Sequence, residues 1–280
     1  MIPKIIHQTW KGDESTIPEH WKQLYNNWKT LTSKDGWTYM FWTDEKNDKF
    51  IKEYYPWFLE QFRGYEHGIQ RADAIRYFIL HKYGGFYSDL DVGPSDKFET
   101  FYEMVKGENI VIPYTCKKNQ AAGQKVTNWF LGSQPGSDFW ELVWKYLTGE
   151  KKIPMWKRFA KRFSYYFEIL LSTGPGIIQD AVNNYDGDMY IIPSEISHSD
   201  GVEHYKGILE HEEGSSWHKG SSGFLKSSGD FFSDHGTTIW IIFTILLLFL
   251  TIILWVKWRK LVNNSIKKKP MKSMKSIRHV

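Results

Sequence analysis

The chain has 280 residues, of which 41% are hydrophobic and 17% aromatic, and its formal net charge is +4 at pH 7. The length suits one globular domain, and the single cysteine, Cys116, excludes an internal disulfide. Nine of the 36 Lys and Arg residues lie within 257–280, which has no acidic residue, so the rest of the chain carries 27 basic and 32 acidic residues. Because this basic tail follows an apolar segment, we expect contact with a membrane and not with nucleic acid.

The hydrophobic pattern before the tail alternates between short strands and longer helices. Strands are predicted at 4–8, 37–42, 85–89, 110–113 and 189–193, and helices at 19–31, 45–54, 70–83, 138–147 and 177–184. Asp44 and Asp138 are the expected N-caps of two helices. The alternation indicates an α/β domain over residues 1–235 with a mostly parallel sheet. Within it, residues 214–235 are rich in Gly and Ser and are expected to hold a motif and a linker.

The most informative segment is 69–91, where a helical pattern ends at the double glycine at 84–85 and a short strand leads to Asp89 and Asp91. Carboxylates at i and i+2 point to opposite faces of a strand, so both reach one cation only if the strand ends there. The Gly-Pro pair at 93–94 is expected to end it. A hard divalent cation held by few carboxylates keeps open positions for phosphate oxygens. Alone, however, Asp-x-Asp is a weak motif, since acidic turns are common.

The neighbouring residues resemble a known family. The sequences RADAIRY at 71–77 and YGGFYSDLD at 83–91 look like glycosyltransferase family 32, the DXD sugar-binding family. Further blocks are similar in the same order, namely IPKIIHQTW at 2–10, NWFLGS at 128–133, TGPG at 173–176 and GSSWH at 214–218. The resemblance implies a GT-A type, Rossmann-like α/β glycosyltransferase domain. The family includes fungal mannosyltransferases of glycan and inositol-phosphoceramide synthesis.

This resemblance implies a donor site at the carboxyl ends of the strands, where ligands of such sheets bind. The catalytic residues it implies are Asp73, Arg76, Asp89, Asp91 and Asn128. The substrate contacts it implies are Thr9, Trp10, Arg71, Gly85, Tyr87, Ser215 and Trp217. The metal, Mn²⁺ or Mg²⁺, would be held by Asp89 and Asp91 together with His211 or His218, while Glu212 and Ser215 are alternative ligands.

Each assignment has a structural alternative. Asp73 and Arg76 lie one turn apart and can form a simple surface ion pair. Trp10 is one of 14 tryptophans, most of which must serve packing. A histidine such as His211 or His218, in a Gly- and Ser-rich stretch, can simply be solvated. The position of Asp73 and Arg76 beside the Asp-x-Asp strand favours a donor pocket over a surface ion pair. In such a pocket the fork of an arginine side chain suits a diphosphate.

The implied reaction moves a hexosyl group from a nucleotide sugar with retention at the anomeric carbon. The metal would neutralise charge on the departing diphosphate. The resemblance favours mannose from GDP-mannose and a membrane-associated acceptor such as inositol phosphoceramide. One alternative is UDP-sugar-dependent transfer to a protein or polysaccharide glycan. The other is a catalytically inactive, membrane-anchored scaffold.

Residues 237–256 form an uncharged apolar run, and about 20 such residues span a bilayer as a helix. Trp240 near one end, with Trp255 and Trp258 near the other, suits the two interfaces. We therefore predict a single-pass transmembrane helix followed by the basic tail at 257–280, in an endomembrane such as the ER or Golgi in a eukaryotic cell or host. The side of the membrane on which the α/β domain lies stays open. The basic tail favours a lumenal domain, whereas the predicted first strand follows Met1 without a signal peptide.

Residues 156–171 are predicted to form one basic amphipathic helix. Its apolar face would hold Trp156, Phe159, Phe163, Phe167 and Leu170, and its basic face Lys157, Arg158, Lys161 and Arg162. Such a helix either packs on the sheet or lies on a membrane, where it attracts anionic head groups. A lipid acceptor favours the second interpretation.

Overall fold

A computed structural model describes residues 1–34, 36–114, 125–162, 165–193, 207–212, 245 and 247–259. The chain divides into two compact units, Met1–Asp230 and Phe231–Val280. The first unit contains the sheets and the helices that pack on them, and the second contains a helix near the end of the chain.

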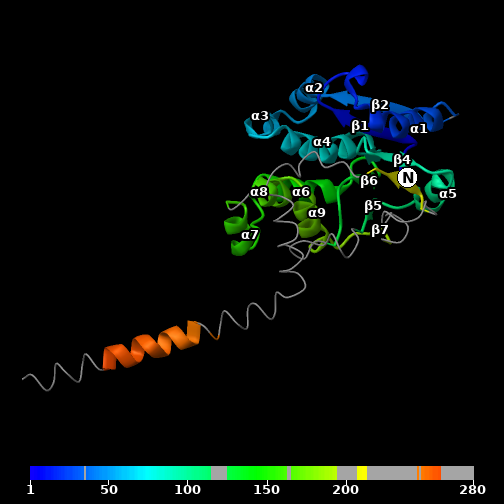
Figure 1. The fold of residues 1–280 in the computed structure, drawn as a ribbon. Helices are drawn as coiled ribbons and strands as arrows, with labels where there is room; N and C mark the ends of the chain where they lie inside the picture. Colours follow the sequence, from blue (N-terminus) through cyan, green and yellow to red (C-terminus); the bar gives the residue numbers. More distant parts are fainter. Residues whose placement is uncertain are drawn as a thin grey trace, which may run out of the picture. The chain divides into compact units, whose positions relative to one another are not determined.

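Six strands form the central sheet of the first unit in the order β2-β1-β3-β6-β5-β7 (Figure 1). Their bounds are Ile5–Trp10 for β1, Thr38–Thr43 for β2, Gly85–Ser88 for β3, Ile110–Pro113 for β5, Phe130–Ser133 for β6 and Tyr190–Ile192 for β7. β1 is parallel to β2 and to β3, and β5 is parallel to β7, but β6 runs antiparallel to both β3 and β5. The predicted α/β class is confirmed, and the sheet is mixed because of β6, a strand that the sequence analysis did not predict.

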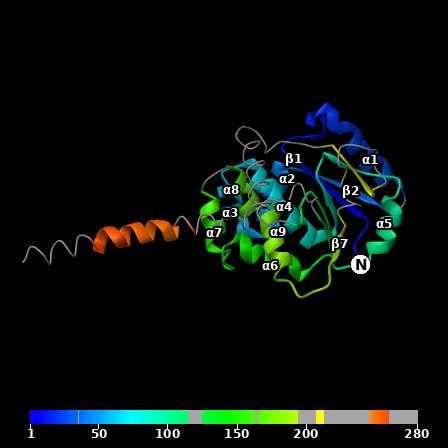
Figure 2. The same cartoon turned by 60° about the horizontal axis from the view of Figure 1, so that its bottom comes forward.

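Helices cover both faces of this sheet (Figure 2). On one face lie α1 (Lys22–Thr32) and α5 (Phe98–Val105), and on the other lie α2 (Asp44–Tyr54), α4 (Gly68–Tyr83), α6 (Asp138–Leu147) and α9 (Pro175–Val182). Three further α-helices are α3 (Leu59–Gly64), α7 (Met155–Ala160) and α8 (Tyr165–Ser172), and 3₁₀ turns occupy Glu14–Thr16, Glu19–Trp21 and Pro56–Phe58. Large buried side chains such as Trp28 and Phe98 on one face, and Phe78 and Trp140 on the other, fill the two layers.

The double glycine predicted to end a helix does so. α4 begins with a capping box, in which Gln70 Oε1 accepts from the backbone N–H of His67 at 3.1 Å, and it ends at Gly84 with φ of 65°. Gly85 follows with φ of 86°, and a Cβ there would lie 2.6 Å from the carbonyl oxygen of Ile5. Only glycine therefore allows β3 to approach β1 this closely.

Two predicted helix caps are wrong by one residue. Thr43 caps α2, since its hydroxyl accepts from the backbone N–H of Lys46 at 3.2 Å, and Asp44 is the first helical residue. Ser137 likewise precedes α6, and Asp138 lies in its first turn. In the first turn a carboxylate still interacts favourably with the helix dipole, which explains why acidic residues mark these helix starts.

The Gly-Pro pair at 93–94 does not end a strand, contrary to the prediction. β3 ends at Ser88, the chain turns, and both residues belong to β4 (Val92–Pro94). β4 pairs antiparallel with β8 (Leu209–His211) in a second, two-stranded sheet. The turn between β3 and β4 therefore holds Asp-x-Asp, and β8 brings a distant part of the chain beside it.

The single amphipathic helix predicted at 156–171 is also wrong. α7 ends at Ala160 and α8 begins at Tyr165. Lys157, predicted on the basic outer face, is buried and its Nζ lies 2.5 Å from Asp180 Oδ1 in α9. Leu170, on the predicted apolar face, is buried in a small core cluster of α8, which favours the packed alternative for this residue. Packing of both helices on α9 therefore decides which faces are exposed.

In the second unit, residue 245 and residues 247–259 are helical. Among the described residues, we find no helix with both the length and the apolar character needed to cross a membrane. Positions 237–244 and 246 of the predicted span lie outside the described residues.

Candidate active site at the Asp-x-Asp turn

The expected catalytic residues meet at one edge of the central sheet because of the direction of β6. Asp89 and Asp91 follow the carboxyl end of β3, and Asn128 lies just before β6. Since β6 is antiparallel to β3, its amino end lies beside the carboxyl end of β3, where the backbone N–H of Asp89 donates to the carbonyl of Trp129 at 2.8 Å. A segment far away in the sequence is thus placed next to the Asp-x-Asp turn.

Arg76 lies at the centre of the site and is only 2% exposed. Its guanidinium is 3.0 Å from Asp73 Oδ1 and 3.3 Å from Asp89 Oδ1. It also donates to the carbonyl oxygen of Asn128 at 2.6 Å and to a carbonyl of its own helix at 3.1 Å. The Asp73–Arg76 pair is therefore buried, and the surface ion pair considered as an alternative is wrong. One buried cation offsets the repulsion of two carboxylates.

Asn128 holds the Asp73 carboxylate as well. Its Nδ2 donates to Asp73 Oδ1 at 2.9 Å and to the Tyr77 hydroxyl at 3.1 Å, and that hydroxyl donates to the carbonyl of Thr173 at 2.7 Å. Burial raises the pKa of Asp73, while the charge of Arg76 and the hydrogen bond from Asn128 oppose this rise. Tyr77 was not predicted, although it lies one turn beyond Asp73 on α4. The signal available in the sequence was its position four residues after Asp73, which places both side chains on the same face of the helix.

Hydrogen bonds to the backbone fix the Asp-x-Asp turn. The carbonyl oxygen of Asp89 accepts from the N–H of Val92 at 3.1 Å, from Ser88 Oγ at 3.2 Å and from Gln8 Nε2 at 3.1 Å. Gln8 Oε1 in turn accepts from the Tyr39 hydroxyl at 2.8 Å. The sequence analysis contained Gln8 only as part of the opening block, because nothing in a single sequence indicates which backbone group a buried amide will contact.

The carboxylates of the turn have the electrostatics of a cation site. Burial raises the pKa of Asp89, Arg76 opposes the rise, and the charge of Asp91 adds to it. The Tyr87 hydroxyl donates to Asp89 Oδ1 at 2.9 Å. A bound divalent cation would stabilise both ionised carboxylates, and carboxylate oxygens are ligands that Mg²⁺ and Mn²⁺ accept. The donor set therefore fits such an ion.

The second sheet brings His211 to this turn. In β8 it pairs with Val92, and its Nε2 lies 3.8 Å from Asp91 Oδ2. Its ring stacks on Trp129 with centroids 5.2 Å apart, and the N–H of Glu212 donates to the carbonyl of Asp91 at 2.9 Å. Three other expected residues, Ser215, Trp217 and His218, lie outside the described residues. Among the described residues, His211 is the expected histidine that lies beside Asp91, and its role as a metal ligand stays a prediction.

Trp10 and Thr9 lie at the carboxyl end of β1, as expected, and both contact neighbouring residues. Trp10 Nε1 donates to Thr16 Oγ1 at 2.9 Å, Trp21 meets its ring edge-on at 5.8 Å, and the ammonium of Lys11 lies 5.4 Å from its centroid. Thr9 Oγ1 donates to a carbonyl of β2 at 3.2 Å. Contact of either residue with a nucleotide base stays a prediction.

Arg71 and Gly85 are placed differently from the central cluster. Arg71 Nη1 donates to the carbonyl of Tyr65 at 2.8 Å, beside the start of α4. Gly85 is the first residue of β3, at the strand end opposite Asp89, and its close approach to β1 is a structural reason for glycine. The structure therefore favours a packing role for Gly85 over the expected contact with substrate.

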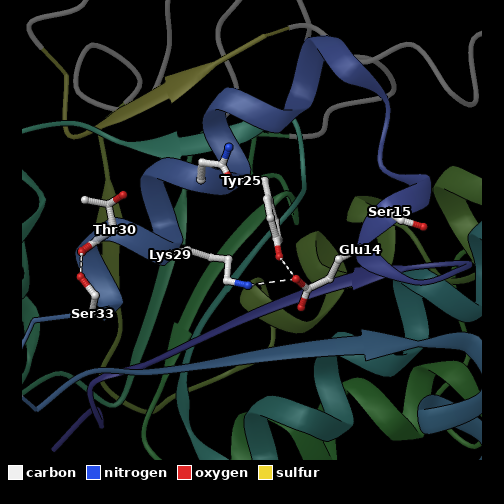
Figure 3. Close-up of a pocket in the computed structure, with 7 residues that line it drawn as sticks. Glu14, Ser15, Tyr25, Lys29, Thr30 and Ser33 are labelled. Atoms are coloured by element: carbon white, nitrogen blue, oxygen red, sulfur yellow. Dashed lines mark hydrogen bonds and ion pairs between the residues drawn. The ribbon is translucent and has the colours of Figure 1, made fainter.

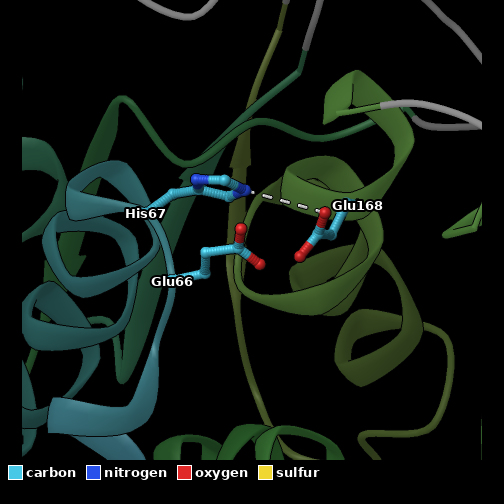
Figure 4. Close-up of side chains that lie close together, drawn as sticks. All are labelled: Glu66, His67 and Glu168. Atoms are coloured by element: carbon cyan, nitrogen blue, oxygen red, sulfur yellow. Dashed lines mark ion pairs between the residues drawn. The ribbon is translucent and has the colours of Figure 1, made fainter.

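A second group of possible metal ligands lies at the amino end of α4. In the described part of the chain, the ligand atoms of Glu66, His67 and Glu168 all lie within 4.8 Å of one another (Figure 4). The His67 ring accepts a hydrogen bond from the backbone N–H of Gln70, while its Nε2 lies 3.7 Å from Glu168 Oε2. A neutral imidazole that accepts at one nitrogen carries its proton on the other. The group therefore fits a helix cap paired with a carboxylate better than a metal site.

A shallow pocket of about 630 Å³ lies beside α1 and the 3₁₀ turn at Glu14–Thr16 (Figure 3). Lys29 Nζ lies 2.9 Å from Glu14 Oε2, and the Tyr25 hydroxyl donates to the same carboxylate. Because these charged groups satisfy one another, the pocket does not present an unpaired charge to a ligand. None of its lining residues belongs to the Asp-x-Asp cluster.

Residues 18–112, which include Asp73, Arg76 and both aspartates of the turn, match the family described as "Glycosyltransferase sugar-binding region containing DXD motif". The resemblance predicted from the sequence is confirmed. The Asp-x-Asp turn lies within the segment that matches this family, at the position of the motif in its description.

The curated relatives extend this similarity. A mannosyl phosphorylinositol ceramide synthase of Saccharomyces cerevisiae is 40% identical over 185 residues, which cover 66% of this chain and 43% of the relative. An inositol phosphoceramide mannosyltransferase of Schizosaccharomyces pombe is 37% identical over 178 residues, covering 62% and 44%. An uncharacterized glycosyltransferase of Acanthamoeba polyphaga mimivirus is 26% identical over 204 residues, covering 71% and 73%. The chain spans less than half the length of these two fungal relatives.

A solved structure described as "PaToxG Glycosyltransferase" aligns with a TM-score of 0.42 and 14% sequence identity, and the alignment covers 65% of this chain and 69% of the other.

Proposed function

We propose that the chain is a metal-dependent, retaining glycosyltransferase with a GT-A type domain that transfers mannose from GDP-mannose to a membrane-associated acceptor such as inositol phosphoceramide. The observation that carries the proposal is the cluster of buried Asp73, Arg76 and Asn128 with half-buried Asp89 in the DXD turn. A buried, hydrogen-bonded set of charges costs desolvation free energy, so its presence at a sheet edge is typical of a functional site. The similarity to mannosyltransferases supports the choice of sugar.

The residues of the cluster have distinct roles in this proposal. Asp73, held by Arg76 and Asn128, presents its carboxyl group to hydroxyl groups of the donor sugar. The charge of Arg76 opposes the rise in the pKa of Asp73 that burial causes. Asp89 and Asp91, with His211, would hold Mn²⁺ or Mg²⁺, which supplies charge neutralisation for the departing diphosphate when bound.

The acceptor is proposed from the names of the relatives together with the apolar end of the chain. Both fungal relatives are named for inositol phosphoceramide or its mannosylated product. Described side chains of the C-terminal helix, such as Phe249 at 65% exposed and Ile252 at 57%, are apolar and exposed. Such a surface favours an apolar environment. We therefore propose membrane attachment in an endomembrane, through the sequence at 237–256, with the basic tail on anionic lipid.

The proposal is tested by donor hydrolysis with the purified full chain. GDP-mannose and a panel of UDP-sugars are incubated with and without Mn²⁺ or Mg²⁺, and release of the nucleotide diphosphate is measured. The test variant is Asp91→Asn, and the matched control is Asp96→Asn, an exposed aspartate in the segment that follows β4. We expect metal-dependent turnover of GDP-mannose that is lost in Asp91→Asn and kept in Asp96→Asn.

Other outcomes separate the alternatives. Turnover of a UDP-sugar instead of GDP-mannose would support a different hexosyltransferase. Neither turnover nor metal-dependent nucleotide binding by the folded chain would support the inactive scaffold. A donor that turns over is then offered inositol phosphoceramide in mixed micelles, and absence of a mannosylated lipid would reject this acceptor.

A further inference from the structure

The outer face of α7 is defined by how the helix is fixed on its inner face. The ammonium of Lys157 lies 2.5 Å from the carboxylate of Asp180, and both residues are buried. Successive helical residues are rotated by about 100°, so Met155 and Arg158 lie on the outer side when Lys157 points inward. Met155 is 70% exposed and Arg158 is exposed. The buried ion pair therefore commits the helix to presenting one apolar and one cationic side chain to the solvent.

The surroundings of this face are cationic. From Lys151 to Phe167 the sequence has six Lys or Arg residues and no Asp or Glu. Lys152, Arg158 and Arg162 are exposed, and the described residues form no ion pair with any of the three. The positive charge of this surface is thus not balanced by described acidic side chains. A surface of this kind has a strong preference for an anionic partner.

α8 links this surface to α4, the helix that carries Asp73. α7 packs against α8, which begins at Tyr165. Burial raises the pKa of Tyr165, and the charges of Glu168 and Asp73 add to the rise, so the start of α8 lies within electrostatic reach of the site. Near the other end of α8, Ser172 Oγ accepts from Gln70 Nε2 at 3.0 Å. The two helices therefore connect the cationic surface with the wall of the site.

We propose that the outer face of α7, with Met155, Arg158, Arg162 and the preceding Lys152, is a contact surface for a bilayer that carries anionic head groups. Arginine and lysine side chains place their stems along apolar surface and their charges at the level of the phosphates, while an exposed methionine enters the boundary region. The inference rests on the proposed function, because the purpose of this contact surface would be to hold the donor site near a membrane-bound acceptor. It differs from the predicted 156–171 helix, because Ile169, Leu170 and Leu171 of α8 are buried.

The test places an environment-sensitive fluorophore on the surface itself, so that binding by the basic tail does not produce the signal. Met155→Cys is made in a Cys116→Ser background, which leaves one thiol in the full chain, and the control label is on Thr30→Cys, an exposed position of α1. Each labelled chain is mixed with vesicles of phosphatidylcholine alone or of phosphatidylcholine with phosphatidylinositol. We expect a blue shift at position 155 with the anionic vesicles only, and no shift at position 30.

The charge contribution is tested in the same labelled chain. Arg158→Gln with Arg162→Gln removes two cations from the surface, and each cation near an anionic membrane contributes about a factor of five. The partition reported by the label should therefore weaken by about 30-fold. Lys34→Gln with Lys52→Gln removes two exposed cations elsewhere and should leave the partition unchanged.

Four results would overturn the inference. These are no shift at position 155, an equal shift with uncharged vesicles, an equal shift at both labelled positions, and a partition that the two control substitutions weaken as much as the arginine substitutions do. A shift at position 155 produced by an acidic protein or by RNA, but not by anionic vesicles, would also overturn it in favour of that partner. Hydrolysis of GDP-mannose, measured on the same samples without vesicles, tests the proposed function separately.

Discussion

Removing the cation at the centre of the cluster is the most direct test of how this site is held together. In Arg76→Met, the aliphatic stem is largely retained, but Asp73 and Asp89 lose a guanidinium that lies 3.0 and 3.3 Å away. The side chain of Asp73 is only 8% exposed, so water replaces little of the lost interaction. Breaking a buried ion pair from one side costs about 3–5 kcal/mol, a large share of the about 5–15 kcal/mol that stabilises a typical domain.

The sign of the pH dependence follows from the pKa of Asp73. Burial raises this pKa above its ordinary value, and Arg76 opposes the rise, so Arg76→Met raises it further. A carboxyl whose pKa is higher in the folded state than in the unfolded state binds a proton on folding in the interval between the two values. The free energy of unfolding of the variant should therefore be higher at low pH and should fall as the pH rises through the raised pKa.

The assay is urea denaturation of the full chain, followed by tryptophan fluorescence, at about pH 5 and about pH 8. Arg76→Met with Asp73→Asn removes the more buried of the two uncompensated charges and should recover about 1–3 kcal/mol at the higher pH. A loss below about 1 kcal/mol in the single variant would refute the reasoning, because that is the size expected for an exposed pair. Equal losses at both pH values, with no recovery in the double variant, would refute the charge argument in particular.

Three further predictions concern single contacts, and urea denaturation measures the first two. Gly85→Ala should destabilise the fold by about 2–4 kcal/mol, because a Cβ at this positive φ would clash with the backbone of β1. The control Gly36→Ala shares φ of 86° but has space for a Cβ, so it should cost about 1 kcal/mol. Equal losses in the two variants would contradict the clash. Lys157→Met should lower the free energy of unfolding by about 3–5 kcal/mol, and adding Asp180→Leu should recover most of this loss. Absence of recovery would indicate that the ion pair is solvated. Gln8→Met removes a hydrogen bond to the DXD turn, so the apparent Mn²⁺ affinity in donor hydrolysis should weaken about fivefold with little change in kcat. A lower kcat with unchanged Mn²⁺ affinity would exclude a positioning role for Gln8.

Much of the architecture could be predicted from local sequence, because it depends on local physical rules. The helix at 138–147 and the strand at 110–113 have the predicted bounds, and most other predicted elements differ at their ends by a few residues. The double glycine at 84–85 ends a helix and begins a strand, as glycines at positive φ can. By contrast, 156–171 has a helical hydrophobic period but breaks into two helices, since the period does not say which face will meet α9.

The sequence by itself determined the α/β class, the helix carrying Asp73 and Arg76, and the DXD turn that follows it, because all of these depend on residues close together in the chain. The resemblance assigned Asn128 and His211 to the site, but only the tertiary structure shows how they reach it. The antiparallel direction of β6 brings Asn128 to the site, and the pairing of β4 with β8 brings His211. Strand direction and pairing are set by contacts between distant segments, and hydrophobic period and turn chemistry do not contain that information.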